Sequence, residues 1–202
     1  MKLFFAITII VLNSALGLGQ VAEFQFKKDS YKFPDTKEGV VLEHEFELIE
    51  SYSYVSFLLA PVLKTYNEQF GVIDSMSRIL FNKPTPTRLA KLWVNFQQKH
   101  DFNPIHRHGG AVSFVIWIDI PYDINVEKHH SSSKNSAAPL PGYFQFTYVN
   151  ILGQISSHNI PADSKFKNQM VMFPAGLPHC VYPFRTSDEY RISVSGNFVF
   201  DT

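Results

Sequence analysis

The chain has 202 residues, a mass of 23.1 kDa and 45% hydrophobic residues, which is enough for one well-filled core. Its 18 Lys and Arg residues balance 18 Asp and Glu residues, so no global charge favours nucleic acid or an anionic membrane as a partner. The single cysteine, Cys180, excludes an internal disulfide framework and any Cys-based zinc site.

Residues 1–19 have the pattern of a secretory signal peptide. Lys2 precedes an apolar run from Leu3 to Leu12, and small residues follow up to a cleavage position after Gly17 or Gly19. The run is too short to span a bilayer comfortably. The alternative is a buried strand at the start of the fold. We therefore expect a signal peptide at 1–19, which indicates the secretory route, and one domain over 20–202.

The first half of this domain is expected to be partly helical. Between 50 and 70, apolar side chains such as Val55, Leu59 and Leu63 recur at spacings of three and four. Pro61 within this run predicts a kink or two shorter helices. The pattern at 73–80 does not distinguish helix from strand.

After the break at 84–86 the chain reads as a series of short strands separated by Gly and Pro. About seven strands in roughly 110 residues are typical of a sandwich or barrel. The fold class is therefore mainly β (α+β), a jelly-roll or cupin-like barrel with a helical N-terminal part and a β core at about 89–200. Residues 127–142, rich in Ser and Pro, are expected to form an exposed loop.

Two histidines, His106 and His108, stand one residue apart just before the apolar strand expected at 112–120. Residues i and i+2 of a strand point to the same face, so the two imidazoles should project side by side. A third histidine, His179, follows an apolar strand and a Phe-Pro turn. The three are candidate metal ligands, because a facial set of three side chains leaves open positions on iron(II).

The strand expected at 190–200 adds a different chemical group. Arg191 and Ser193 share one face of it, twelve residues after His179. An arginine inside a barrel is costly unless it is paired, and its planar fork suits a carboxylate. No acid on these strands is an obvious partner, so a co-substrate could supply the carboxylate. The alternative is a surface ion pair with Asp188 or Glu189.

These motifs resemble the iron(II)/2-oxoglutarate-dependent oxygenase superfamily. More narrowly, four runs resemble prolyl-4-hydroxylase-like members from marine phages and bacteria: Trp-Val-Asn-Phe at 93–96, Phe-Asn-Pro-Ile-His-Arg-His-Gly at 102–109, His-Cys-Val-Tyr-Pro at 179–183 and Arg-Ile-Ser-Val-Ser-Gly-Asn at 191–197. The likeness covers roughly residues 89–198, and the order and spacing of the runs make it fairly specific.

The resemblance implies a double-stranded β-helix that uses Fe(II), 2-oxoglutarate and O2 to hydroxylate a C–H bond, with peptidyl proline as a candidate substrate and succinate and CO2 as products. It implies that His106, His108 and His179 bind the metal, and that Arg191 with Ser193 binds the far carboxylate of 2-oxoglutarate. It also suggests a cytoplasmic location. The superfamily usually has Asp or Glu where His108 stands, so a three-histidine set carries one less negative charge.

Strand parity suggests Asn95, Trp117 and Tyr148 as lining residues of the pocket. Cys180 is expected to be a small buried residue rather than a nucleophile. Two other functions stay open: a three-histidine cupin-type metalloenzyme that does not use 2-oxoglutarate, and a non-catalytic jelly-roll binding protein. No nucleic-acid partner and no stable membrane span are indicated.

Overall fold

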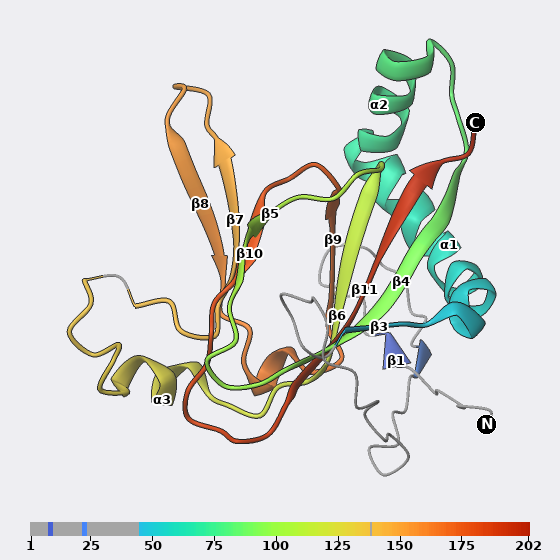
Figure 1. The fold of residues 1–202 in the computed structure, drawn as a ribbon. Helices are drawn as coiled ribbons and strands as arrows, with labels where there is room; N and C mark the ends of the chain where they lie inside the picture. Colours follow the sequence, from blue (N-terminus) through green and yellow to red (C-terminus); the bar gives the residue numbers. More distant parts are fainter. Residues whose placement is uncertain (1–7, 10–21, 24–44, 138) are drawn as a thin grey trace.

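A computed structural model describes residues 8–9, 22–23, 45–137 and 139–202 (Figure 1). Most of the predicted signal peptide lies outside these residues. Its described part, β1 (Thr8–Ile9), pairs antiparallel with β2 (Ala22–Glu23). Within the part of the chain that the structure describes, no helix has the length and apolar character needed to cross a membrane.

Two antiparallel sheets form the centre of the described chain, in agreement with the predicted β character. The larger sheet has five strands in the order β3-β4-β11-β6-β9. In this order its strands are β3 (Glu45–Glu47), β4 (Thr87–Gln97), β11 (Arg191–Phe200), β6 (Val112–Asp119) and β9 (Met170–Pro174).

The smaller sheet has four strands in the order β5-β10-β7-β8 and lies opposite the larger one (Figure 1). Its strands are β5 (Asn103–His106), β10 (His179–Val181), β7 (Phe144–Val149) and β8 (Ile155–Ile160). Aromatic side chains pack in part of the space between the sheets: Phe144 and Phe146 of β7 belong to one buried cluster with Trp117 of β6 and Phe173 of β9. The inner faces of both sheets therefore share a core.

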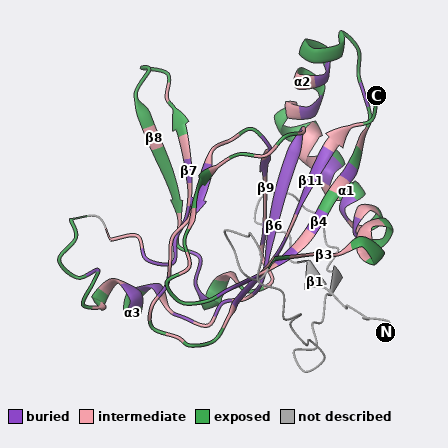
Figure 2. Cartoon of the chain, viewed as in Figure 1, coloured by how far each residue is buried: buried purple, intermediate pink, exposed green. Residues whose placement is uncertain are grey.

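Strand β6 is buried along its whole length up to Ile118, as its continuous apolar run predicts (Figure 2). Its side chains alternate between two cores. Phe114 and Ile116 face the helices, whereas Val115 and Trp117 face the smaller sheet. Opposite Phe114, a Cβ on Gly196 would come within 2.6 Å of the phenyl ring. Only glycine lets β11 pass under that ring.

Two helices, α1 (Tyr52–Phe70) and α2 (Val72–Phe81), cover the outer face of the larger sheet (Figure 1). Helix α1 buries Val55, Leu59 and Leu63 in the outer core. Pro61 does not divide the segment into two helices as one alternative held, because burial of this apolar stripe outweighs one lost backbone hydrogen bond. The ambiguous run at 73–80 proves to be helical.

The expectation of an exposed loop over 127–142 was wrong at its start. Residues 124–129 form a short helix, α3 (Ile124–His129), in which the side chain of Glu127 is 0% exposed. Its carboxylate accepts hydrogen bonds from the backbone N–H groups of Arg185 and Thr186 and from the hydroxyl of Thr186. A buried carboxylate is stable here because these donors replace water.

Candidate metal centre and carboxylate-binding pocket

The three histidines predicted as metal ligands lie together on the inner side of the smaller sheet. His179, the first residue of β10, pairs directly across the ladder with His106, the last residue of β5. His108 lies two residues beyond, where its backbone N–H donates to the carbonyl of Ala175 at 2.9 Å. One ring nitrogen from each histidine lies within 4.8 Å of those of the other two. The cluster could hold a metal ion.

Backbone carbonyls orient two of these rings. Nδ1 of His106 lies 2.7 Å from the carbonyl oxygen of Pro104, and Nδ1 of His179 lies 2.9 Å from that of Leu177. A proton on Nδ1 satisfies each carbonyl, which leaves the lone pair on Nε2 free to bind a metal. The donor set thus fits a cation such as iron(II), for which imidazole is a suitable ligand.

Burial keeps the imidazoles of His179 and His108 neutral. It lowers the pKa of His179 to about 4, with further lowering by the neighbouring histidines. The pKa of His108 is also lowered to about 4, mainly by burial and in part by His106 and Lys91. A neutral imidazole is the form that binds a metal. At neutral pH the site needs no proton release from these two side chains.

Aromatic rings enclose the cluster. Phe144 stacks on His179 with ring centroids 5.5 Å apart, and Phe173 meets the same imidazole edge-on at 4.9 Å. On the other side, the indole of Trp93 lies 5.5 Å from the ring of His108. These contacts hold the rings by packing and exclude water from one side of the site.

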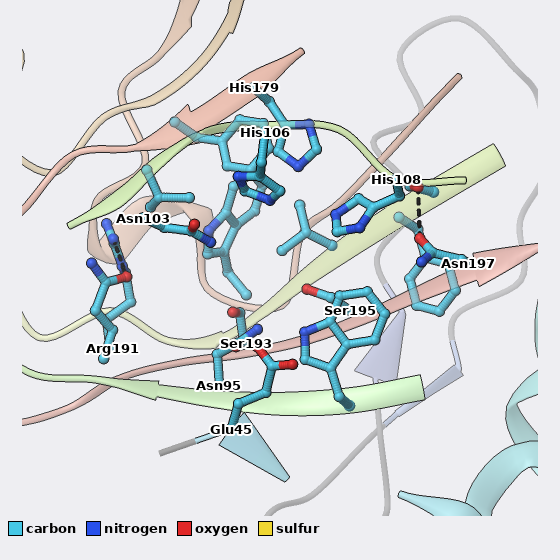
Figure 3. Close-up of a pocket in the computed structure, with 18 of the residues that line it drawn as sticks. Glu45, Asn95, Asn103, His106, His108, His179, Arg191, Ser193, Ser195 and Asn197 are labelled. Carbon is cyan, nitrogen blue, oxygen red and sulfur yellow. Dashed lines mark hydrogen bonds between the residues drawn. The ribbon is translucent and has the colours of Figure 1, made fainter. Parts of the chain in front are cut away.

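A cavity of about 250 Å³ runs between the two sheets, with the histidines on one wall (Figure 3). Along the opposite wall, β11 presents Arg191, Ser193 and Ser195 at alternating positions, as the strand parity predicts. Asn95 and Trp117, each opposite Ser193 in the ladder, also line the cavity. Tyr148 does not line it as suggested, because it lies far along β7 and is 43% exposed.

The guanidinium of Arg191 is buried at one end of this cavity and is 3% exposed. Its acceptors are all neutral: Gln97 Oε1 receives Nε–H at 3.1 Å and Nη2–H, and Tyr182 O receives Nη2–H at 3.3 Å. Nη1 donates to the hydroxyl of Tyr122 at 2.5 Å and to the carbonyl of Gly142 at 3.1 Å.

The predicted alternative was a surface ion pair of Arg191 with Asp188 or Glu189. Asp188 pairs with Lys99 instead. Arg191 is also too buried for a surface pair. Instead it lies against the rings of Tyr122 and Phe184, 5.8 and 5.7 Å from their centroids. A buried cation without an acidic partner is costly, and an incoming carboxylate would offset that cost.

The sequence alone did not identify Gln97, Tyr122 and Glu45 as parts of this site. Gln97 follows Asn95 at the same strand parity and could have been found by extending that alternation. Tyr122 and Glu45 carry no local signal, because their positions depend on pairings with distant segments. Cys180 is buried as expected.

Taken together, the facing sheets and the histidine cluster define an antiparallel β protein with a candidate metal site. A sequence model of the family described as "Putative 2OG-Fe(II) oxygenase" matches residues 91–197. The chain belongs to this family of oxidoreductases, whose name specifies iron and 2-oxoglutarate. The match spans both segments that carry the clustered histidines and the first part of β11, including Arg191.

Solved structures resemble the chain only distantly. A 2OG-Fe(II) oxygenase family oxidoreductase from Burkholderia pseudomallei is 13% identical, with 62% of this chain and 50% of that chain covered and a TM-score of 0.41. Hydroxypropylphosphonic acid epoxidase from S. wedmorenis is 6% identical, with 56% and 44% covered and a TM-score of 0.26. The chain spans half of these proteins' lengths or less. No curated protein matches it.

Proposed function

We propose that the protein is an iron(II)- and 2-oxoglutarate-dependent dioxygenase that hydroxylates a C–H bond. His106, His108 and His179 would hold the iron, and Arg191 with Ser193 would bind the far carboxylate of 2-oxoglutarate. One observation carries this proposal: a single cavity has three clustered imidazoles on one wall and a buried arginine without an acidic partner at one end.

The chain's own residues have separate tasks in this proposal. The carbonyls of Pro104 and Leu177 keep Nε2 of two histidines unprotonated and aimed at the cluster. Arg191 fixes one end of the co-substrate by charge and by its planar fork. The rings of Phe144 and Phe173 keep water away from the metal side. Orientation and a dry pocket are what a protein contributes to cofactor chemistry.

When bound, iron(II), 2-oxoglutarate and O2 supply the oxidation: one oxygen atom enters the substrate C–H bond, the other enters succinate, and CO2 leaves. The resemblance suggests a peptidyl proline as the substrate. The finer description of the fold, a double-stranded β-helix within one domain at 20–202, belongs to the same proposal and is supported by the two facing antiparallel sheets.

A second function has an observation of its own in its favour. Every N–H of Arg191 already donates to a protein acceptor, and the donor set contains no carboxylate. A three-histidine metalloenzyme that does not use 2-oxoglutarate would leave Arg191 in this structural role. A non-catalytic binding protein is the third reading.

Succinate formation from 2-oxoglutarate with added iron(II) distinguishes these functions. The assay compares the parent with His179→Ala, Arg191→Ala and the control His158→Ala, whose histidine is exposed on β8. We expect turnover in the parent and control and at least about a hundredfold loss in the other two. Equal turnover in all four proteins overturns the assignment. Iron binding that requires His179, without any turnover, favours the second or third function.

A further inference from the structure

Strand β3, at the edge of the larger sheet, brings a carboxylate to the cavity. Glu45 pairs across the ladder with Asn95, which in turn lies opposite Ser193 on β11. The three side chains form a polar row that faces the histidine wall (Figure 3). Glu45 is not one of the clustered metal-ligand candidates, so it is available for another task.

The carboxylate is held by a short chain of hydrogen bonds. In the amide orientation that satisfies both groups, Nδ2 of Asn95 donates to Oε2 of Glu45 at 2.8 Å, and Oδ1 accepts from Nε1 of Trp93 at 3.1 Å. The same indole lies against the ring of His108. Trp93 therefore lies next to both the candidate metal ligand and the group that positions Glu45.

The charge distribution in the cavity indicates what Glu45 can bind. Among the described residues that line it, Glu45 is the one Asp or Glu and Arg191 is the one Lys or Arg. They are not each other's partners, because all five N–H groups of Arg191 donate elsewhere. Once Arg191 is used for the co-substrate, Glu45 is the charged group left to face a substrate.

The surroundings of Glu45 favour a positively charged partner. Glu45 stays exposed in part, and loss of some of its water raises the pKa of its carboxyl against a smaller lowering by Lys91, so a cation that replaces this water would stabilise the carboxylate. Lys91 is exposed and does not line the cavity. The nearby indole of Trp93 offers a face to which a cation is attracted.

We propose that Glu45 is the specificity-determining residue of this site, and that the substrate carries a positively charged nitrogen, an ammonium or a guanidinium, near the C–H bond that is oxidised. This inference rests on the proposed function. The substrate class differs from the peptidyl proline named above, since a proline within a peptide carries no charge for Glu45 to recognise.

Both tryptophans of the chain, Trp93 and Trp117, line the cavity, so their fluorescence reports ligand binding directly. The probes are the Nα-acetyl methylamides of lysine, arginine, norleucine and proline, titrated into the full chain loaded with iron(II) and 2-oxoglutarate under nitrogen. The variant is Glu45→Gln. The control is Glu47→Gln, which removes a charge on the same strand from a side chain outside the cavity that accepts from Tyr52.

For the parent and Glu47→Gln we expect about tenfold tighter binding of the lysine or arginine probe than of norleucine, and about equal binding of the two classes by Glu45→Gln. A parent that does not prefer a basic probe, or that prefers proline, overturns the inference. A preference for basic probes that persists in Glu45→Gln also overturns it. The same holds if Glu45→Gln weakens iron binding and leaves probe selectivity unchanged.

Succinate formation, measured in the same samples with each probe present after admission of air, distinguishes failure of the role of Glu45 from failure of the proposed function. Turnover in all three proteins with no preference for basic probes leaves the proposed function intact and removes the role of Glu45. A Glu45-dependent preference without any succinate supports the binding site and removes the oxygenase activity.

Discussion

Gln97 occupies the position on Arg191 that a carboxylate would need. Its Oε1 accepts from both Nε and Nη2 of the guanidinium, while its Nε2 donates to the carbonyl of Asp101 at 2.5 Å. The amide oxygen thus takes the two parallel donors that bind a carboxylate in a bidentate pair. If 2-oxoglutarate binds here, its far carboxylate displaces Gln97, and we predict that Gln97→Ala binds 2-oxoglutarate more tightly than the parent.

The magnitude follows from the bonds that are exchanged. A hydrogen bond to a charged group contributes about 1.5–3 kcal/mol, and the parent gives up one such acceptor atom, Gln97 Oε1, which two N–H groups share, before it gains those of the carboxylate. Removal of the competing amide should therefore tighten binding by about 1.5–3 kcal/mol, roughly 10- to 150-fold. Without 2-oxoglutarate the variant should be less stable by about 1–3 kcal/mol, because two N–H groups of a guanidinium that is 3% exposed lose their shared acceptor, Gln97 Oε1.

Urea unfolding with and without 2-oxoglutarate, in iron(II) under nitrogen, measures both effects. A ligand that binds the folded state stabilises it according to its affinity, so 2-oxoglutarate should stabilise Gln97→Ala more than the parent. Gln98→Ala is the control, since Gln98 is exposed on the neighbouring position and bonds Tyr190 instead. If Gln97→Ala binds 2-oxoglutarate as tightly as the parent or more weakly, the far carboxylate does not displace Gln97 from Arg191.

Three further predictions concern the histidines and the buried carboxylate of α3. Burial lowers the folded-state pKa of His108 and His179 to about 4, so the unfolded chain binds more protons than the folded one between pH 4 and the ordinary pKa of 6.5. The free energy of unfolding of the metal-free protein should therefore fall as pH drops through this window, by about 1–3 kcal/mol per histidine at pH 4.5. In urea unfolding, His179→Gln should make this dependence on pH weaker. Glu127→Ala should lower the free energy of unfolding by about 3–5 kcal/mol, since Arg185 and Thr186 lose their buried acceptor. Glu127→Gln keeps an acceptor and should lower it by less. A loss below about 0.5 kcal/mol in Glu127→Ala contradicts this account. Iron(II) titration should show at least about tenfold weaker binding for His108→Ala and retained binding for His108→Asp, and unchanged affinity in His108→Ala would remove this residue from the ligand set.

Much of the candidate site follows from strand parity in the sequence. The spacing of His106 and His108, the position of His179 after a turn and the alternation of Arg191 with Ser193 predicted which side chains would share the cavity, and all of them lie close to it or line it. For Arg191 and Ser193 this worked because β11 fixes the direction of alternate side chains locally, whatever the distant pairing is. His108 lies two residues past the end of β5, and the bond from its backbone N–H to the carbonyl of Ala175 holds it there.

Residues whose position depends on a remote pairing could not be predicted in this way. Glu45 reaches the cavity only because β3 joins the edge of β4, and Tyr122 reaches Arg191 from outside any strand. Glu127 precedes a Ser-rich run whose composition predicts exposure, yet its carboxylate is buried, where it accepts hydrogen bonds from the backbone N–H groups of Arg185 and Thr186. In each case the deciding contact joins segments whose separation in the chain leaves no local pattern.

The segment between β10 and β11 links the two halves of the proposed cofactor site. It follows β10, whose first residue is His179, and leads to Arg191, the first residue of β11. Within it, the carbonyl of Tyr182 accepts from Arg191 and the ring of Phe184 packs against the guanidinium. Glu127 anchors the next two residues of this segment through their backbone amides. A change at Glu127 therefore acts on the segment that positions both His179 and Arg191, so loss of its carboxylate should weaken 2-oxoglutarate binding together with stability.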